Sequence, residues 1–337
     1  MKLKAILTFF VCAMLFSCVE EEQYNNSAKG NFEALWKILD EHYCFFDYKK
    51  EVIGLDWNEV HDKYAVRINN NMTNAQLFEV LCDMLSELQD GHVNLYAAHD
   101  VGRNWSWYES YPSNFSADVQ KKYLGRDYMI ASGIKYKILD DNIGYIFIES
   151  FSDGIGDGNL SQVLNDLAIC NGIIVDVRDN GGGNITTSQK VANRFCNEKK
   201  LVGYICHKTG KGHSDFSELK PMYLEPSDGV RWQKKAVVLT NRQCYSATNS
   251  FVNEMRYCPN VTIVGDKTGG GSGLPFSSEL PKGWSVRFSA CPMFDAEKKQ
   301  IEFGIEPDIY VDMDSSDALK GYDTLIEYAR KLLGGKL

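Results

Sequence analysis

The sequence predicts an α/β fold preceded by a small helical region, and three observations support this. Short apolar runs rich in β-branched residues recur after residue 138: NIGYIFIESF (142–151), GIIVDVR (172–178), AVVLT (236–240) and VTIVG (261–265). Stretches with helical spacing separate these runs, namely LSQVLNDLAIC (160–170), TTSQKVANRFC (186–196) and the segment that follows Ser246. A further helical stretch, DTLIEYARKLLG (323–334), closes the chain. This alternation is typical of a sheet built from βαβ units.

The residues before 138 divide into two parts. Residues 30–98 are predicted to be helical, because the segments at 31–43 and 73–88 place their apolar residues largely on one helical face. Residues 99–137 are aromatic and polar with little periodicity, which predicts a connector with irregular or β structure. The predicted organisation is therefore a helical domain at 30–98, a connector at 99–137 and an α/β domain at 138–337.

The composition is that of a globular protein with an acidic balance. The chain has 337 residues, of which 44% are hydrophobic, and this is enough to bury a substantial core in two domains. The formal net charge is −9 at pH 7, and no block of Lys and Arg stands out. Because nucleic-acid binding needs a basic surface, we expect no nucleic-acid partner.

The first 18 residues have the pattern of a secretory signal peptide. MKLKAILTFFVCAMLFSC begins with two lysines, continues with an apolar stretch and ends with a small residue before Cys18. LFSC resembles the lipobox of bacterial lipoproteins, in which the cysteine becomes the lipid-bearing first residue. We therefore expect an exported protein anchored to the bacterial cell envelope through Cys18, with residues 19–29 as a polar tether. A plain signal peptide with an incidental cysteine is the alternative.

Eight cysteines remain once Cys12 and Cys18 are set aside. Their spacings are wide and irregular, no CxxC pair occurs, and most have apolar neighbours, so we expect them mainly in the core. Cys244 is the exception, because its thiol lies two residues before Ser246.

Several loops at the ends of predicted elements carry polar or glycine-rich sequences. They are QDGHVNLY (89–96), DVRDNGGGNITT (176–187), CYSATNS (244–250), VGDKTGGGSG (264–273) and EFGIEPDIYV (302–311). The glycine run at 181–183 lacks the spacing of nucleotide-binding motifs. Two interpretations remain for it: a plain turn, or a loop that presents bare backbone N–H groups to a reacting oxygen.

Ser246 and His92 are a candidate nucleophile and a candidate base, although each also has a structural interpretation. A serine between a strand and a helix is usually an N-cap. A single histidine after a helix is usually a packing residue, and no HExxH motif or neighbouring histidine supports a metal site. The co-occurrence of a nucleophile, a base, a glycine loop and acidic residues in the loops of one chain favours a catalytic site. We expect no metal and no cofactor.

Five motifs in order carry a family resemblance: LQDGHV (88–93), GIIVDVRDNGGG (172–183), VVLTNRQCYSATNSF (237–251), TIVGDKTGGG (262–271) and GIEPDI (304–309). They resemble the C-terminal-processing (tail-specific) serine peptidases, a family that includes the tricorn core protease and the interphotoreceptor retinoid-binding protein modules. The resemblance covers about residues 80–312, and LWKILDEHYCFF (35–46) is similar to the helical N-terminal domain of bacterial members. It implies a crotonase-like ββα sheet core in the α/β domain.

The resemblance also implies roles for individual residues. Ser246 matches the serine nucleophile, with Gly91 beside the candidate base as a supporting residue. The N–H of Ala247 and a glycine of NGGG, Gly182 in first place, match the oxyanion hole. Backbone donors at a helix start and in a glycine loop are suited to this role because they need no reorganisation.

The family divides over the general base. At the position where the tail-specific branch has its lysine, this chain has Gly271, and Lys267 matches an additional, non-catalytic lysine of that branch. The chain therefore resembles the tricorn-like branch, in which the histidine of the GH motif is the base and an acidic residue orients it. That histidine is His92. For the acid, the family position is Ile301, so Glu302 is the first candidate and Glu306 the second.

These observations lead to an exported, lipid-anchored serine endopeptidase whose partner is a peptide or protein substrate. The connector at 99–137 does not resemble the PDZ domain that many members insert, so substrate tails cannot be recognised by strand addition to such a domain. The alternative is a catalytically silent lipoprotein on the same fold that binds peptides or lipophilic molecules. A purely structural envelope lipoprotein is a third interpretation, but it does not explain the five motifs.

Overall fold

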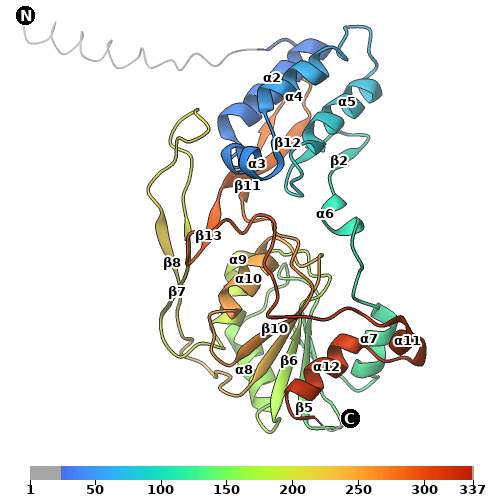
Figure 1. The fold of residues 1–337 in the computed structure, drawn as a ribbon, viewed down its shortest axis with the longest axis vertical. Coiled ribbons are helices and arrows are strands. Elements are labelled where there is room, and N and C mark those ends of the chain that lie inside the picture. Colours follow the sequence, from blue (N-terminus) through green and yellow to red (C-terminus); the bar gives the residue numbers. More distant parts are fainter. Residues whose placement is uncertain (1–23, 336–337) are drawn as a thin grey trace, which may run out of the picture.

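The computed structural model describes residues 24–335 and is elongated, with a helical lobe at one end and a sheet lobe at the other (Figure 1). The predicted signal peptide, Cys18 and the first part of the predicted tether lie outside the described residues. Within residues 24–335, the helices are too short or too polar to span a bilayer.

The helical lobe contains four helices that begin at capping signals or short turns in the sequence. They are α2 (Ala28–His42), α3 (Phe46–Ile53), α4 (Trp57–Ala65) and α5 (Asn74–Ser86). Helix α5 starts with a capping box, in which the Thr73 hydroxyl accepts from the Gln76 N–H and the Gln76 side chain accepts from the Thr73 N–H. Their apolar faces meet in one core, as the spacing of apolar residues predicts.

A four-stranded antiparallel sheet covers this helical core. Its strands are, in order, β11 (Leu274–Glu279), β12 (Ser285–Cys291), β1 (Asn94–Tyr96) and β2 (Val101–Arg103). Trp284, Val286 and Phe288 pack into the helical core. The region predicted as one α/β domain at 138–337 is therefore interrupted, because residues 274–291 leave it to complete the other lobe. Local patterns do not show which sheet a strand joins, since that depends on long-range pairing.

The sheet lobe is built on a seven-stranded sheet. Its strands are, in order, β14 (Ile309–Tyr310), β10 (Val261–Gly265), β9 (Ala236–Thr240), β6 (Gly172–Asp176), β5 (Ile143–Ile148), β4 (Ile134–Ile138) and β3 (Met129–Ala131). The pairs among β14, β10, β9, β6 and β5 are parallel, whereas β4 and β3 pair antiparallel. Strands β3 and β4 come from the predicted connector, so its second half belongs to this sheet.

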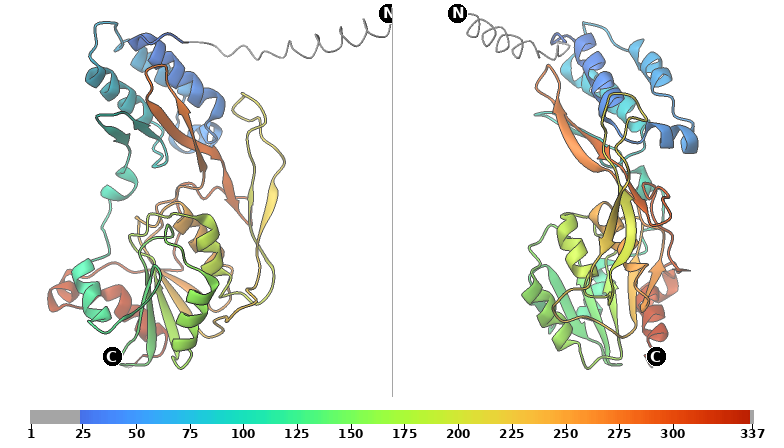
Figure 2. Two further views of the ribbon diagram at one scale, coloured as in Figure 1. Left: turned by 180° about the vertical axis from the view of Figure 1, so that it is seen from behind. Right: turned by 90° about the vertical axis from the view of Figure 1, so that its left-hand side faces the viewer.

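Helices cover both faces of the large sheet, which explains why its central strands are continuous apolar runs. One face carries α8 (Asp157–Asp166), α9 (Ile185–Ala192) and α10 (Ala247–Met255). The other face carries α7 (Ala117–Leu124) and α12 (Thr324–Leu332). The right-hand view of Figure 2 shows the green helices α8 and α9 on one side and the red helix α12 on the other.

The remaining elements lie beside or between the lobes. They are the short helices α6 (Ser106–Glu109) and α11 (Ser315–Lys320) and a three-stranded sheet of β13 (Met293–Asp295), β7 (Lys200–Ile205) and β8 (Lys220–Leu224). The loops that follow β6, β9 and β10 leave the carboxyl ends of neighbouring parallel strands. This edge is where ligands bind in open α/β sheets, and the predicted glycine loop and Ser246 both lie there.

Candidate active site

Ser246 lies at the junction of strand β9 and helix α10, in a backbone conformation that is rare for a residue with a side chain. Its φ is 59° and its ψ is −121°. The hydroxyl makes no capping hydrogen bond to α10, so Ser246 is not a side-chain cap. Instead, its Oγ lies 3.0 Å from Nε2 of His92. Strained turns of this kind persist at functional sites because they expose the side chain of the residue at the turn.

Both the backbone and the ring of His92 are held by neighbouring residues. Its backbone N–H donates to Oδ1 of Asp90 at 2.8 Å, and its ring packs edge-on against Tyr245 at a centroid distance of 5.0 Å. Only 3% of His92 is exposed. Nε2 faces the Ser246 hydroxyl, whereas Nδ1 is buried and has no hydrogen-bond partner among residues 24–335.

The environment of His92 favours the neutral imidazole. Burial lowers the pKa of His92 from 6.5 to about 4, the Asp90 carboxylate opposes this, and the Arg287 guanidinium adds to it. The ring is therefore neutral at neutral pH, and with its one proton on Nδ1 it leaves Nε2 free. An unprotonated Nε2 that faces a hydroxyl is able to accept its proton.

The Asp90 carboxylate accepts four hydrogen bonds next to His92. Besides the His92 N–H, it accepts from the hydroxyls of Tyr43 (3.0 Å), Ser289 (2.8 Å) and Tyr245 (3.3 Å). These donors come from the helical lobe, from β12 and from the residue before Ser246. Burial alone would raise the pKa of Asp90, but the Lys49 ammonium, His92 and the hydrogen bond from Ser289 together hold the pKa below its usual value. Asp90 thus joins the His92 loop to the nucleophile turn.

Glu302, the first candidate for the acid, does not contact His92. Its Oε2 accepts from the Ser272 N–H at 2.8 Å, and its Oε1 lies 3.5 Å from Nζ of Lys49. Burial and the nearby Asp90 carboxylate raise its pKa to about 8, although Lys49 opposes them. The structure therefore does not bring Glu302 to Nδ1 of His92. Its side chain instead ties the loop after β10 to helix α3.

The other two charged candidates lie away from the nucleophile. Lys267 pairs with Glu306 at 2.9 Å, and the Glu306 side chain is mostly exposed. The Glu306 carboxylate also accepts from the Tyr310 hydroxyl. Neither residue contacts Ser246 or His92, so the structure does not support Glu306 as the orienting acid.

Gly271 cannot carry a side chain in this structure. Its φ is +78°, and a Cβ built there would lie 2.4 Å from Cζ of Tyr245. Gly91 is similarly enclosed, because its Cβ would lie 2.6 Å from Nε1 of Trp107 and 2.9 Å from the Tyr245 hydroxyl. The packing of Tyr245 therefore excludes a lysine at position 271 and requires the glycine before His92.

The glycine loop reaches the nucleophile, but its donors differ from the prediction. A Cβ on Gly182 would lie 2.7 Å from the Tyr245 oxygen and 3.0 Å from the Ala247 nitrogen, so this glycine packs directly on the turn. Its own N–H donates to Oδ1 of Asn180 at 2.9 Å. Gly181 and Gly183 line the cleft instead. The N–H groups of Ala247, Gly181 and Gly183 donate to no acceptor within residues 24–335.

These groups border a cleft of about 520 Å³ between the two lobes. One wall carries Ser246 and the glycine loop, and the other comes from β1, β2, β12 and the segment after β2. The lining residues are Gly91, His92, Asn94, Tyr96, Val101, Arg103, Trp105, Trp107, Gly181, Gly183, Tyr245, Ser246 and Arg287. Among residues 24–335, no cluster of three or more His, Cys, Asp or Glu side chains could hold a metal ion.

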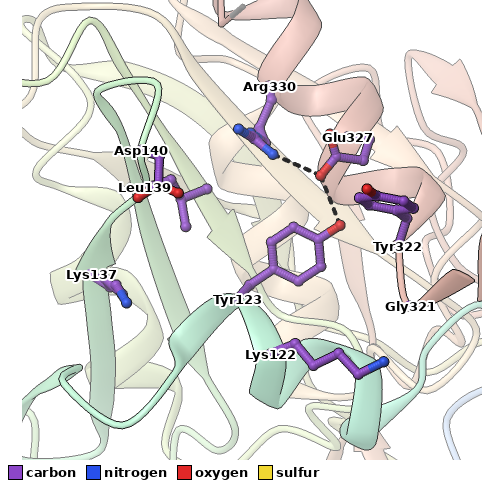
Figure 3. A pocket seen from close by; sticks show the side chains of 9 residues that line it. All are labelled: Lys122, Tyr123, Lys137, Leu139, Asp140, Gly321, Tyr322, Glu327 and Arg330. Atoms are coloured by element: carbon purple, nitrogen blue, oxygen red, sulfur yellow. Dashed lines mark hydrogen bonds and ion pairs between the residues drawn. The ribbon is translucent and has the colours of Figure 1, made fainter. Parts of the chain in front are cut away.

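A second pocket, of about 260 Å³, lies beside α7 and α12 and away from Ser246 (Figure 3). Three of its polar groups bond to one another: the Tyr123 hydroxyl and the Arg330 guanidinium both donate to Oε1 of Glu327, at 2.7 and 2.8 Å. Arg330 also donates to Asp141. This pocket is therefore explained by the packing of α7 on α12.

The cysteines take no part in the cleft. The eight described cysteines are unpaired, and six of them are buried. Cys244 donates to the Val177 carbonyl at 3.1 Å, and burial raises the pKa of its thiol well above the ordinary value. A protonated, buried thiol is not a nucleophile.

Comparison with known families identifies the chain. The model of peptidase family S41 matches residues 142–311, about half of the chain. The chain belongs to peptidase family S41. The model of the tricorn protease C1 domain matches residues 24–86 of this family member, which supports its resemblance to the tricorn-like branch.

Solved structures similar to this S41 chain confirm the predicted fold class. A crystal structure of a Parabacteroides merdae protein has 53% sequence identity and a TM-score of 0.88, and the match covers 92% of this chain and 97% of that chain. Mature CPAF complexed with lactacystin has 12% identity and a TM-score of 0.69, over 91% and 97% of the two chains. At that identity the likeness concerns the fold alone.

Two curated relatives are longer than this S41 chain. Carboxy-terminal processing protease CtpA of Bacillus subtilis is 24% identical over 62% of this chain and 46% of its own length. Tricorn protease of Thermoplasma acidophilum is 27% identical over 56% of this chain and 16% of its own length. The matched part of the chain therefore spans less than half of either relative.

Sequence reasoning missed several residues of the site. Asp90 stands inside the LQDGHV motif, so its position next to His92 is a usable signal. Lys49 and Tyr43 carry no local signal, because an ordinary amphipathic segment explains both. Arg287 lies in a strand that pairs with β1 only in the folded chain.

Proposed function

We propose that this protein is a serine endopeptidase that cleaves peptide bonds through an acyl-enzyme on Ser246, with His92 as general base. The observation that carries the proposal is the 3.0 Å separation of Ser246 Oγ and His92 Nε2 at the edge of an open cleft. The strained backbone of Ser246 and membership of peptidase family S41 support it.

In the acylation step, His92 Nε2 accepts the hydroxyl proton as Ser246 Oγ attacks the carbonyl carbon of the scissile bond. The oxyanion that forms receives hydrogen bonds from the Ala247 N–H and from Gly181 or Gly183. Each such donor contributes ~3 kcal/mol to the transition state. The imidazolium then donates its proton to the amine nitrogen as the C–N bond breaks, which leaves an ester on Ser246.

Deacylation repeats these roles with water. His92 accepts a proton from the water that attacks the ester carbon, and it returns this proton to Ser246 Oγ as the new carboxyl group leaves. Asp90 and Tyr245 hold the His92 loop against the nucleophile turn throughout, because their hydrogen bonds join the two segments.

Labelling with a fluorophosphonate probe tests the nucleophile. Wild type should be labelled, Ser246→Ala should not, and His92→Ala should be labelled much more slowly, because the serine then lacks its base. A matched control is Ser250→Ala, which removes a hydroxyl from the same helix. Absence of labelling in folded wild type would favour the catalytically silent binding protein on this fold.

We also propose that the protein is exported and anchored through a lipid on Cys18. The basic start, the apolar stretch and LFSC in the sequence support this. Cys18→Ala should move the exported protein from the membrane fraction to the soluble fraction, whereas Cys12→Ala should leave it in the membrane fraction. Equal solubility of wild type and Cys18→Ala would contradict the anchor.

A further inference from the structure

The four-stranded sheet presents one face to the helices and the other to the active-site cleft. Leu95 and Val286 point into the helical core. Asn94 is the register partner of both Arg287 on β12 and Arg103 on β2. Because directly opposed residues of antiparallel strands project from the same face, these three side chains form a row across the sheet. All three line the cleft that contains Ser246.

The two arginines of this row have no carboxylate partner among residues 24–335. Two other arginines of the sheet lobe, by contrast, have carboxylate partners: Arg178 pairs with Asp176 and Asp323, and Arg242 pairs with Asp266. Arg103 is exposed, and its guanidinium lies 3.9 Å from the centre of the Trp105 ring. Arg287 is half-buried, although removing a guanidinium from water without a counter-charge is unfavourable. The two guanidinium groups of the row therefore have no anionic partner among residues 24–335.

The other residues that line the cleft carry no charge at neutral pH. No Asp or Glu is among its lining residues, and His92 is neutral at neutral pH. Among residues 24–335, Arg103 and Arg287 are therefore the only charged side chains that line the cleft, within a chain whose formal net charge is −9. Arg287 lies close enough to His92 to lower the pKa of the imidazole, so its charge acts next to the reacting atoms. A cleft of this kind concentrates anionic ligands.

We propose that the Arg287–Asn94–Arg103 row is a substrate subsite that binds a carboxylate of the peptide close to the scissile bond. Guanidinium groups match the planar geometry of a carboxylate and bind it through paired hydrogen bonds. The carboxylate has two sources, an Asp or Glu side chain or the free C-terminus of the substrate. This inference rests on the proposed peptidase function and adds the substrate class.

Four peptides that share one scissile core test the proposal and separate the two sources. One carries Glu near the scissile bond with an amidated end, one carries Gln with an amidated end, one carries Gln with a free C-terminal carboxylate, and one carries Lys with an amidated end. Wild type should cleave at least one carboxylate peptide with a kcat/KM about tenfold above that of the amidated Gln peptide. The preferred carboxylate peptide identifies the source.

Arginine variants test whether the preference for a carboxylate peptide comes from Arg103 and Arg287. Arg103→Gln combined with Arg287→Gln should reduce the carboxylate-to-amide ratio to about one, and Arg103→Glu combined with Arg287→Glu should turn the preference towards the Lys peptide. A reversed preference cannot result from misfolding. Lys282→Gln, at the β11–β12 turn outside the cleft, is the control and should keep the wild-type ratio. Equal cleavage of all four peptides by wild type, or an unchanged ratio in the double variants, would overturn the proposal.

Binding separates this inference from the proposed activity. The Kd of each peptide for Ser246→Ala, which cannot turn over, should show the same carboxylate preference, and the arginine variants should remove it. If wild type neither cleaves peptides nor reacts with a fluorophosphonate, the peptidase proposal fails. The subsite is then still supported or overturned by these Kd values.

Discussion

Nζ of Lys49 on helix α3 lies 3.5 Å from Oε1 of Glu302, and both side chains are almost completely buried. The ammonium also donates to the Gln89 carbonyl at 3.0 Å and lies over the Phe303 ring. The helical lobe therefore supplies the cation for the buried carboxyl groups of Asp90 and Glu302. Through Asp90, this cation is linked to His92, so the lobe is part of the active-site framework.

Removal of this cation should destabilise the whole molecule. Lys49→Met leaves the Asp90 carboxylate without its counter-charge, and breaking a buried pair in this way typically costs about 3–5 kcal/mol. The free energy of unfolding, measured by denaturant titration, should fall by that amount. Lys50→Met, a neighbour with an exposed side chain, is the control and should change stability little.

The loss of kcat/KM at acid pH should occur well below the ordinary pKa of histidine. If the general base were a histidine with its ordinary pKa, kcat/KM would rise with pH through about 6.5. Burial and Arg287 instead lower the pKa of His92 to about 4, so kcat/KM should stay level from neutral pH down to about 5 and fall near 4. Arg287→Gln should move this loss to higher pH, because one cause of the lowered pKa is removed. A loss at about 6.5 in wild type would contradict the buried, neutral imidazole.

The same pKa shift has a consequence for stability, with a definite sign. The folded state holds His92 neutral down to about pH 4, whereas the unfolded chain protonates this histidine near 6.5. Between these values the unfolded state binds more protons, so the contribution of His92 to stability is complete above about 6.5 and is lost as the pH falls towards 4. His92→Phe should flatten this part of the stability profile, as measured by thermal unfolding at several pH values.

His92 and Lys267 should differ sharply as candidate bases. His92→Ala removes the group that faces Ser246 Oγ, so kcat/KM should fall at least ~100-fold, as general-base contributions predict. Lys267→Ala removes only a pair with the exposed Glu306, and such pairs contribute about 0–1 kcal/mol, so activity should change little. Steady-state cleavage of one peptide by both variants decides between them. The reverse order would assign a Ser–Lys mechanism.

A side chain at Gly182 should abolish turnover. Its φ is +106°, and any Cβ would overlap the Tyr245 oxygen and the Ser246 Cβ, so Gly182→Val must displace the nucleophile turn. We expect loss of turnover with a cooperative thermal transition retained at a lower temperature. Gly154→Ala is the matched control, since a Cβ there meets nothing within 4 Å and its φ is not positive. Retained activity in Gly182→Val would show that the loop moves independently of Ser246.

The strands and helices of the large sheet could be predicted from the sequence because their signals are local. Strands covered by helices on both faces must be apolar at every position, and the runs at 172–176 and 236–240 show this directly. The position of Ser246, the candidate nucleophile, could be predicted for a similar reason, because it stands between a buried strand and a helix whose spacing is visible in the chain.

The environment of the site could not be predicted in this way, because it depends on contacts between distant segments. Glu302 stands next to the position expected for the acid, yet its side chain turns to Lys49, and only the packing of α3 against the segment between β13 and β14 decides that. Asp90 accepts one hydrogen bond from its neighbour His92 and three from distant parts of the chain, from Tyr43, Tyr245 and Ser289.

By itself, the sequence therefore determined the α/β core and the family, and it named Ser246 and His92 as the candidate pair, since spacing and motif order record them directly. The tertiary structure alone decided the pKa of His92, the partner of Glu302 and the row formed by Arg103, Asn94 and Arg287. Burial and charge at these sites arise from strands and helices that meet only when the chain folds.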